Sequence, residues 1–278
     1  MISTPLYDIW RLLAHPRADC EAEIRSLCRN AYLGDRTSLC RVLGRYKMFA
    51  DTRDIGISSH LMLDGFWEMW VTEAMMRAVR RGSTVIDVGA NLGYFTLLLA
   101  DLTGPEGRVL SFEPNPVLAP RLRKSVEVNG FAPYTHVHEI ALGGVEGYAS
   151  LEVDNVQPGG GRMVSADSTG QVPRVPVRRL DEIPGALDAE FIKIDVEGFE
   201  EHVWEGMSRI LARRTPITIF MEFTIVRYED PRAFLDRIMA DGFALEIIDY
   251  SGHIVPISVD ELFARPHSID HMLAFRRR

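Results

Sequence analysis

One stretch of the chain, Thr84–Ala100, constrains the fold more than any other. It begins with TVIDV, a run of β-branched and apolar residues typical of a strand that is covered on both faces. Gly89 and Gly93 follow, and glycine permits positive φ and leaves no Cβ in the way of a bound molecule. From Leu92 onward, apolar residues repeat at helical spacing. A buried strand, a glycine turn and a helix predict an open α/β sheet with a ligand site at the end of the strand.

The spacing of these glycines argues against a dinucleotide ligand. The pyrophosphate fingerprint is GxGxxG, whereas this turn has only Gly89 and Gly93, four residues apart. Asp87 leads into the turn, where it would repel phosphates and attract a cation. S-adenosylmethionine (SAM) carries an ammonium and a sulfonium and no phosphate, so it suits the turn. The alternative is a turn that only packs the strand against the helix.

A second strand is expected at Arg108–Glu113, followed by a helix over residues 117–128. Glu113 lies about 20 residues beyond Gly93, where an acid in this architecture accepts hydrogen bonds from ribose hydroxyls. The alternative role is that of an acid stabilised by the dipole at a helix N-terminus. We favour the ribose role because of the distance from the glycine turn.

The composition excludes several classes of protein. The chain has 278 residues and is 46% hydrophobic, which allows an ample core. No apolar run approaches the roughly 18–20 residues that span a bilayer, and the N-terminus lacks the pattern of a secretory signal. The net charge is −8, without a long basic run, which disfavours nucleic-acid binding. Three cysteines without a CxxC fit a reducing compartment. We expect a cytoplasmic protein without a membrane span.

The first 80 residues are expected to form a mainly helical cap on the substrate side of a cofactor-binding domain at residues 81–278. Apolar spacing predicts a helix over residues 7–31 and a short helix over Asp35–Leu43. Two short strands are expected to follow, at residues 46–52 and 55–57.

The segment Ser58–Trp70 combines polar and aromatic side chains at high density. His60, Asp64 and Glu68 (or Trp67) recur at helical spacing and can share one face. Burying such a mixture without a function costs desolvation energy. These four side chains are therefore candidates for binding substrate beside the glycine turn. The alternative is that the tryptophans anchor the core and the polar groups cap a helix.

A second informative stretch is Phe191–Glu200, where apolar residues alternate with Lys193, Asp195 and Glu197. Charges in a central strand are costly unless they pair or face a cavity. The next strand ends in Glu222. Because parallel strands end at one edge, we expect the three acids to converge in one crevice. The alternative is a structural ion-pair cluster around Lys193.

The rest of the chain completes an α/β pattern. A glycine-rich loop at Asn155–Ser165 is expected to act as a lid and to influence substrate choice. Asp230 is expected to cap a helix at Pro231–Ala240. The remaining strands are expected at residues 134–142, 148–153, 172–177, 243–250 and 270–275.

Three motifs together resemble the signatures of FkbM-type methyltransferases: VIDVGANLG at residues 85–93, FEP at 112–114 and FIKIDVEG at 191–198. The resemblance covers about residues 84–225. It implies the α/β, Rossmann-like fold of class I SAM-dependent methyltransferases, with a seven-stranded, mostly parallel sheet, an antiparallel last strand and helices on both faces.

By position, the resemblance implies that Asp87 and Gly89 lie by the methionine part of SAM, that Glu113 holds the ribose and that Ala141 and Leu142 flank the adenine. Family members commonly methylate oxygen on sugars or polyketides. The full set of expected cofactor-binding residues is Asp87, Gly89, Ala90, Asn91, Gly93, Glu113, Asn115, Ala141, Leu142 and Asp195.

The predicted reaction is O-methylation of a small-molecule hydroxyl by SAM. A hydroxyl acceptor benefits from a general base, and the candidates are Asp195, Glu197, Glu222 and His60. A divalent ion such as Mg²⁺ would suit the carboxylates, but Lys193 competes for their charge, so no metal is expected. The alternatives are N-methylation, a non-catalytic SAM- or nucleotide-binding protein, and an NAD-dependent oxidoreductase, which the missing third glycine disfavours. The sequence leaves the oligomeric state open.

Overall fold

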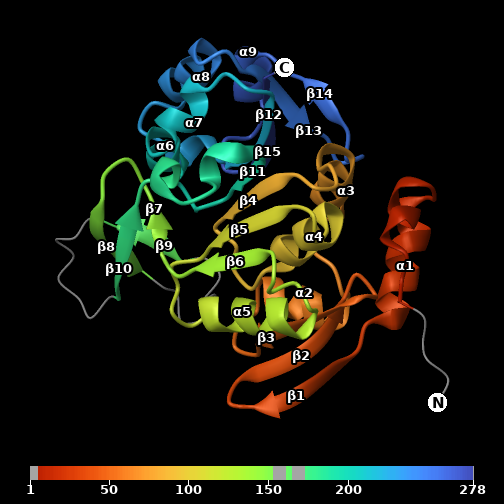
Figure 1. Ribbon diagram of the computed structural model, residues 1–278. Coiled ribbons are helices and arrows are strands. Elements are labelled where there is room, and N and C mark those ends of the chain that lie inside the picture. Colours follow the sequence, from red (N-terminus) through yellow and green to blue (C-terminus); the bar gives the residue numbers. More distant parts are fainter. Residues whose placement is uncertain (1–5, 153–160, 165–172, 278) are drawn as a thin grey trace.

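The computed structural model describes residues 6–152, 161–164 and 173–277. Its main feature is a sheet of eight strands in the order β14-β13-β15-β12-β11-β4-β5-β6 (Figure 1). The strands are β4 Thr84–Val88, β5 Arg108–Phe112, β6 Thr135–His138, β11 Ala189–Ile194, β12 Ile217–Phe223, β13 Ala244–Ile248, β14 Ile254–Pro256 and β15 His271–Arg277.

The strand directions confirm the predicted fold class. Strands β6, β5, β4, β11 and β12 are parallel, and β15 lies antiparallel between β12 and β13. This is the class I SAM-dependent methyltransferase arrangement, in which the last strand inserts antiparallel. The prediction of seven strands is one too few, because the short β14 forms a hairpin with β13 and extends the sheet.

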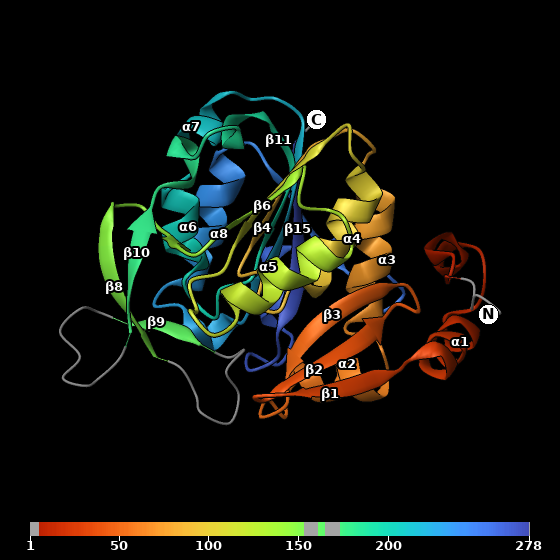
Figure 2. The same cartoon turned by 60° about the horizontal axis from the view of Figure 1, so that its bottom comes forward.

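Helices cover both faces of this sheet (Figures 1 and 2). Side chains alternate between the faces, so Val85 packs in one core cluster while Ile86 and Val88 pack in the other. Asp87 therefore points to the same face as Val85. The helices on that face are α3 Met69–Ala78, α4 Tyr94–Thr103 and α5 Ala119–Val128, and those on the other are α6 Glu200–Glu205, α7 Ser208–Ala212 and α8 Pro231–Ala240. Asp230 caps α8 as expected, by accepting a hydrogen bond from the Ala233 amide.

The N-terminal segment is less helical than predicted. It contains a three-stranded antiparallel sheet, and the helix expected at Asp35–Leu43 is strand β2. Burial alternates strictly along β2, which is a period of two and not the helical period. The strand expected at residues 55–57 is instead a loop leading into α2. The elements here are η1 Ile9–Leu13, α1 Arg17–Leu27, β1 Asn30–Gly34, β2 Thr37–Val42, β3 Tyr46–Asp51 and α2 Ile57–Leu63.

Strand β3 attaches this small sheet to α5. The Phe49 amide donates a hydrogen bond to the Ser125 hydroxyl at 3.0 Å. The buried Asp51 carboxylate pairs with Arg121 at 3.2 Å. One apolar core cluster runs from the N-terminal segment through α3 and α4 to the central sheet. The segment is therefore held to the main sheet by both polar and apolar contacts.

A second small sheet has the order β7-β10-β8-β9. The single strand expected at residues 134–142 is divided between two sheets, because β6 pairs with β5 whereas β7 pairs with β10. Most of the expected lid, Asn155–Ser165, lies outside the described residues. The strands are β7 Ala141–Leu142, β8 Gly147–Glu152, β9 Arg162–Val164 and β10 Arg174–Arg178, and the other short elements are η3 Leu180–Glu182, η4 Ala186–Asp188, η5 Ile225–Arg227 and α9 Val259–Phe263.

None of the helices in the described part of the chain is both long and apolar enough to cross a membrane.

Candidate active site

A cavity of about 350 Å³ opens where β4, β5, β11 and β12 end. This is the sheet edge at which open α/β proteins bind ligands. Twelve of the predicted site residues line it: Trp67, Glu68, Gly89, Ala90, Asn91, Glu113, Asn115, Ala141, Leu142, Asp195, Glu197 and Glu222. Four predicted site residues are not part of the wall, namely His60, Asp64, Asp87 and Gly93.

The glycine turn is shaped by contacts within the protein. A Cβ at Gly89 would lie 1.7 Å from the carbonyl oxygen of Asp195, and the φ of Gly89 is +76°. A Cβ at Gly93 would lie 2.2 Å from Leu122 Cδ1, at a φ of +95°. Both glycines are thus required by close packing and backbone conformation. The positive φ expected of both glycines is present, and Gly89 also borders the cavity.

Glu113 joins the turns that follow β4 and β5. Its Oε2 accepts a hydrogen bond from the Asn91 amide at 2.7 Å, and its Oε1 accepts one from the Asn115 amide at 2.8 Å. Burial raises the pKa of this carboxyl to about 7, although the two amides act in the opposite direction. Each carboxylate oxygen keeps a second lone pair. Glu113 can therefore still accept hydrogen bonds from hydroxyls in the cavity.

A buried polar row lies beneath the cavity on the α4 face of the sheet. The register places Asp87 beside Ser111 on β5 and beside Lys193 on β11. Asp87 is fully buried, accepts a hydrogen bond from the Thr96 hydroxyl and lies 3.9 Å from Lys193 Nζ. Lys193 Nζ lies nearer to Asp195, at 2.9 Å. Asp87 therefore lies below the cavity and is not part of its wall, because its strand position points it toward α4.

The charge states of this row follow from burial and from unequal pairing. Burial by itself lowers the pKa of Lys193, but the carboxylates of Asp195 and Asp87 outweigh it and raise that pKa. Burial also raises the pKa of Asp87, and Lys193 offsets this only in part. We infer that Lys193 is a permanent cation whose main partner is Asp195. The predicted alternative of an ion-pair cluster at Lys193 thus describes this part of the site.

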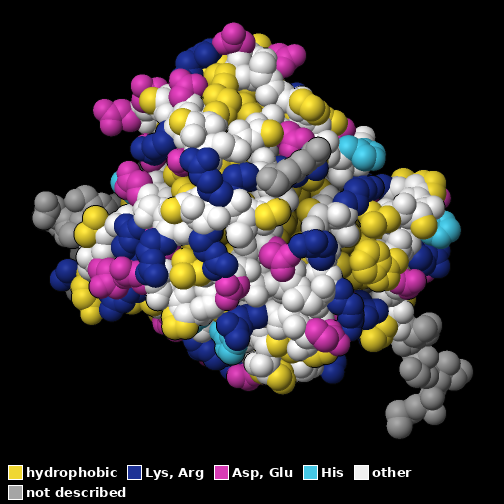
Figure 3. Space-filling view, turned by 45° about the horizontal axis from the view of Figure 1, so that its top comes forward, with side chains coloured by type: hydrophobic (Ala, Val, Ile, Leu, Met, Phe, Trp, Pro, Cys, Tyr) yellow, Lys and Arg dark blue, Asp and Glu magenta, His cyan; other side chains and the backbone are white. Residues whose placement is uncertain are grey.

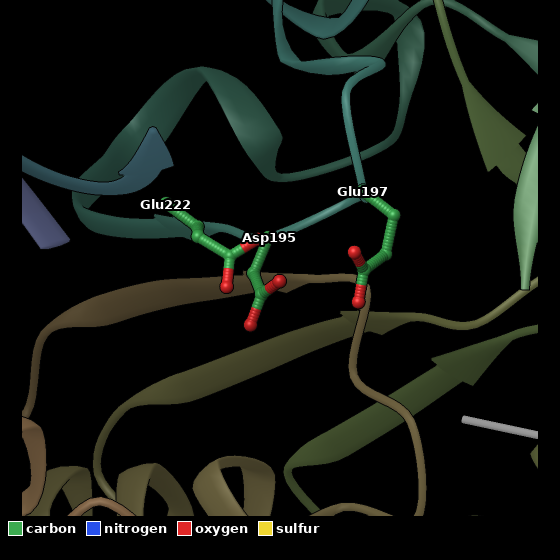
Figure 4. A group of neighbouring side chains, drawn as sticks. All are labelled: Asp195, Glu197 and Glu222. Atoms are coloured by element: carbon green, nitrogen blue, oxygen red, sulfur yellow. The ribbon is translucent and has the colours of Figure 1, made fainter. Parts of the chain in front are cut away.

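Asp195, Glu197 and Glu222 come together as the strand ends suggested. Each offers an oxygen within 4.8 Å of the others, and Figure 4 shows the three carboxyl groups pointing to the same side. Burial raises the pKa values of Glu197 and Glu222, and the neighbouring Asp195 carboxylate adds to both rises. Oxygen donors so arranged suit a divalent cation in principle.

An arginine that sequence reasoning missed already supplies positive charge there. Arg227, at the end of η5, lies 2.7 Å from Glu197, 2.6 Å from Glu222 and 3.5 Å from Asp270. Lys193 therefore neutralises Asp195, while Arg227 neutralises the others. No spacing rule singles out Arg227, because it reaches the acids from the short helix η5 after β12.

The turn that carries Glu197 is held by another missed residue, Glu200. Its Oε1 accepts hydrogen bonds from the amides of Val196 and Gly198, at 3.1 and 3.2 Å. Its Oε2 accepts one from the Tyr228 hydroxyl at 2.6 Å. Glu197 has a φ of 56°, a conformation that costs energy for a residue with a Cβ. These bonds hold that conformation and direct the Glu197 side chain.

Within the polar and aromatic segment Ser58–Trp70, the predicted site residues before Trp67 do not line the cavity, whereas Trp67 and Glu68 do. The His60 side chain is 55% exposed, lies 3.2 Å from Asp64 and packs against the Trp67 ring. Asp64 is itself paired with Arg25 at 2.8 Å. Neither His60 nor Asp64 lines the cavity, so its wall gives no support to the roles predicted for them. Trp67 and Glu68 do form part of the wall.

The charge of the cavity wall is strongly unbalanced. Among the described residues that line it, seven are carboxylic acids and one, Lys193, is basic. Two of these acids, Asp54 and Asp270, were not predicted, because they lie in loops without a distinctive motif. On the face shown in Figure 3, by contrast, basic and acidic side chains are intermingled. The cavity is therefore suited to cationic or neutral ligands.

Comparisons with known proteins identify the family of this chain. The model of the methyltransferase FkbM domain matches residues 87–254. "Methyltransferase 1" of Beauveria bassiana is 26% identical over 147 residues, which are 45% of this chain and 58% of the relative. A protein-L-isoaspartate O-methyltransferase of Ignicoccus hospitalis is 39% identical over 70 residues, which are 25% of this chain and 32% of the relative. The chain thus spans less than two thirds of either relative.

Among solved structures, P. horikoshii TYW2 in complex with MeSAdo is 12% identical, with a TM-score of 0.45 over 96% of this chain and 84% of that chain. The family match rests on the sequence and covers more than half of the chain, including the glycine turn and all of β11. The protein therefore belongs to the methyltransferase FkbM domain family.

Proposed function

We propose that the protein transfers the methyl group of SAM to a hydroxyl oxygen of a small molecule such as a sugar or a polyketide. The observation that carries this proposal is the acidic cavity at the ends of β4, β5 and β11, bordered by the glycine turn of an FkbM domain. SAM, when bound, supplies a methyl group that is already activated. The protein then has to bind the acceptor, orient its hydroxyl toward the methyl group and remove the hydroxyl proton.

The residues present fit SAM as the cofactor. Glu113 would hold the ribose through its remaining lone pairs, since it lines the cavity where the turns after β4 and β5 meet. Ala141 and Leu142 would flank the adenine, and Asp195 would attract the ammonium. The acidic wall favours a cationic ligand and disfavours the phosphates of a dinucleotide. These assignments are those made from the sequence, now without Asp87 and Gly93.

The same wall narrows the class of acceptor. A phosphorylated or carboxylated acceptor would face seven acids of the described wall, whose charge Lys193 and the adjoining Arg227 offset only in part. A neutral polyol, in contrast, can donate hydroxyl hydrogen bonds to carboxylates. Alignment of such an acceptor with the methyl group can contribute up to roughly 7–11 kcal/mol to catalysis. One relative is named an O-methyltransferase, which supports oxygen as the methylated atom.

Calorimetry with purified protein tests the cofactor assignment. SAM and S-adenosylhomocysteine (SAH) are expected to bind, and NAD⁺ is not. Glu113→Gln should weaken SAM binding by about tenfold or more, because hydrogen bonds to a charged group contribute about 1.5–3 kcal/mol. Glu127→Gln, on the exposed face of α5, is the matched control and should bind normally. Binding of NAD⁺ in preference to SAM would refute the proposal.

A screen with SAM that carries a ¹³C-labelled methyl group tests the reaction. Neutral polyols, amines and phosphorylated sugars are offered as three separate groups of acceptors. The NMR shift of the transferred carbon distinguishes an O-methyl from an N-methyl product. O-methylated polyols are expected. Labelled amines would favour N-methylation, and tight SAM binding without product from small-molecule extracts would favour a non-catalytic role.

A further inference from the structure

Glu68 differs from most acids of the cavity in its backbone, which has a positive φ that only Glu197 shares among the acids of the described wall. It is the residue before α3 and has a φ of 35° and a ψ of 63°, in the left-handed region. For a residue with a Cβ this conformation is strained and tends to occur at functional sites. The side chain borders the cavity, whereas Met69 directly after it is buried in the core. The unusual backbone thus accompanies a carboxyl placed at the cavity.

Glu68 also differs in having no partner. Its side chain makes no capping hydrogen bond to α3 and no hydrogen bond or ion pair with any residue that the structure describes. The other acids of the wall are all engaged: Asp54 and Glu113 by backbone amides, Asp195 by Lys193, Glu197 and Glu222 by Arg227, and Asp270 by Thr224 and Arg227. Within the described part of the wall, Glu68 is the carboxyl free to take a proton.

The surroundings of Glu68 suit that task. Burial, together with the Asp195 and Asp270 carboxylates, raises its pKa to about 7, and the Lys193 ammonium acts against them. Near neutral pH such a group can both accept and release a proton, which is the property of an effective general base. A base at Asp195, Glu197 or Glu222 would first have to give up its ion pair with a cation.

We propose that Glu68 is the proton-accepting residue of this site, and that it loses its own proton when the cationic cofactor binds. The proposal rests on the proposed function. The acceptor hydroxyl oxygen forms a bond to the methyl carbon as the carbon–sulfur bond breaks and its electron pair goes to sulfur. The hydroxyl proton goes to a Glu68 carboxylate oxygen. With neutral SAH bound, Glu68 keeps this proton, and the next SAM displaces it to solvent.

Calorimetric proton counting tests this coupling without a known acceptor. SAM and SAH are titrated at pH 7 in buffers of different ionisation enthalpy, which gives the protons released on binding. Because about half of Glu68 is protonated at pH 7, SAM should release up to about half a proton more than SAH. In Glu68→Gln this difference should disappear, and in Glu127→Gln it should remain. An unchanged difference in Glu68→Gln would overturn the proposal.

A measurement on the unmodified protein covers the case in which Glu68→Gln does not fold. The ratio of SAM affinity to SAH affinity should rise as the pH increases through 7 and then level off, because only the ionised carboxylate attracts the sulfonium. A ratio that stays constant between about pH 5.5 and 8.5 would overturn the proposal. Failure of SAM to bind at all would instead refute the proposed function, so the two failures are distinguishable.

Turnover separates a base from a mere electrostatic contact. With an acceptor from the labelling screen, Glu68→Gln should lower kcat by about 10²–10⁴-fold and remove the acidic limb of the pH profile. The KM for the acceptor should change much less. A variant that keeps the pH profile and loses only affinity would show that Glu68 binds ligand without accepting a proton.

Discussion

Replacement of Lys193 by methionine is the most direct test of how the buried charges are arranged. The Lys193 side chain is 2% exposed, and Asp87 beside it is fully buried. The substitution keeps the length of the side chain but removes the ammonium that lies 2.9 Å from Asp195. Removing one member of a buried pair typically costs about 3–5 kcal/mol, because it leaves an uncompensated charge. We expect Lys193→Met to lower the free energy of unfolding by this amount at pH 8.

The loss should depend on pH in a defined direction. Burial already raises the pKa of Asp87, and removal of Lys193 should raise it further. A group whose pKa is higher in the folded state contributes stability at low pH that disappears as the pH rises through that pKa. Lys193→Met should therefore be less destabilising at pH 5 than at pH 8. Adding Asp87→Asn should restore about 1–3 kcal/mol through their interaction.

Urea unfolding followed by circular dichroism measures these differences. Lys124→Met, at an exposed position on α5, is the matched control and should change stability by no more than about 0.5 kcal/mol. A cost below about 1 kcal/mol for Lys193→Met, or a cost independent of pH, would refute the assignment of Lys193 as the cation that balances Asp195 and Asp87.

The other predictions concern the glycine turn, Glu113 and the acidic crevice. Gly89→Ala should lower the free energy of unfolding in urea by several kcal/mol, because its Cβ would lie 1.7 Å from the Asp195 carbonyl oxygen. Gly130→Ala, at a similar φ and with nothing within 4 Å, should lower it by only about 1 kcal/mol. Equal losses would contradict the packing argument. The pKa of Glu113 is raised to about 7. The free energy of unfolding of the unmodified protein, relative to that of Glu113→Gln, should therefore fall by about 3 kcal/mol between pH 4.5 and pH 8. If unfolding experiments across this range show a constant difference between the two proteins, that pKa is excluded. Exhaustive chelation should leave the calorimetric SAM affinity within about twofold, because Arg227 already balances the crevice, and a tenfold loss would indicate a required divalent ion.

The sequence was most informative where a pattern is repeated or local. The apolar run before Gly89 and the alternation around Asp195 predicted the strands, and their order along the chain predicted a parallel sheet. Because parallel strands end at one edge, the convergence of Asp195, Glu197 and Glu222 followed from strand positions alone. The same reasoning failed at residues 35–43, where the period of two along β2 was mistaken for a helix.

The direction of each side chain in the site, and the residues with which it pairs, depended on tertiary structure. Asp87 and Glu113 both lie near the ends of predicted strands, yet the alternation of the strand buries Asp87 against α4 while Glu113 reaches the cavity. Arg227 approaches the acids from the short helix η5, so no spacing in the sequence relates it to Glu197.

The sequence by itself determined the α/β class, the family motifs and the edge of the sheet at which the site lies, because these depend on local periodicity and on the order of the strands. Only the tertiary structure decided which acids are neutralised and which is free. Glu68 and His60 come from one short segment, but one faces the cavity and the other solvent. Pairing depends on distances between residues remote in the chain, and those distances are set by packing.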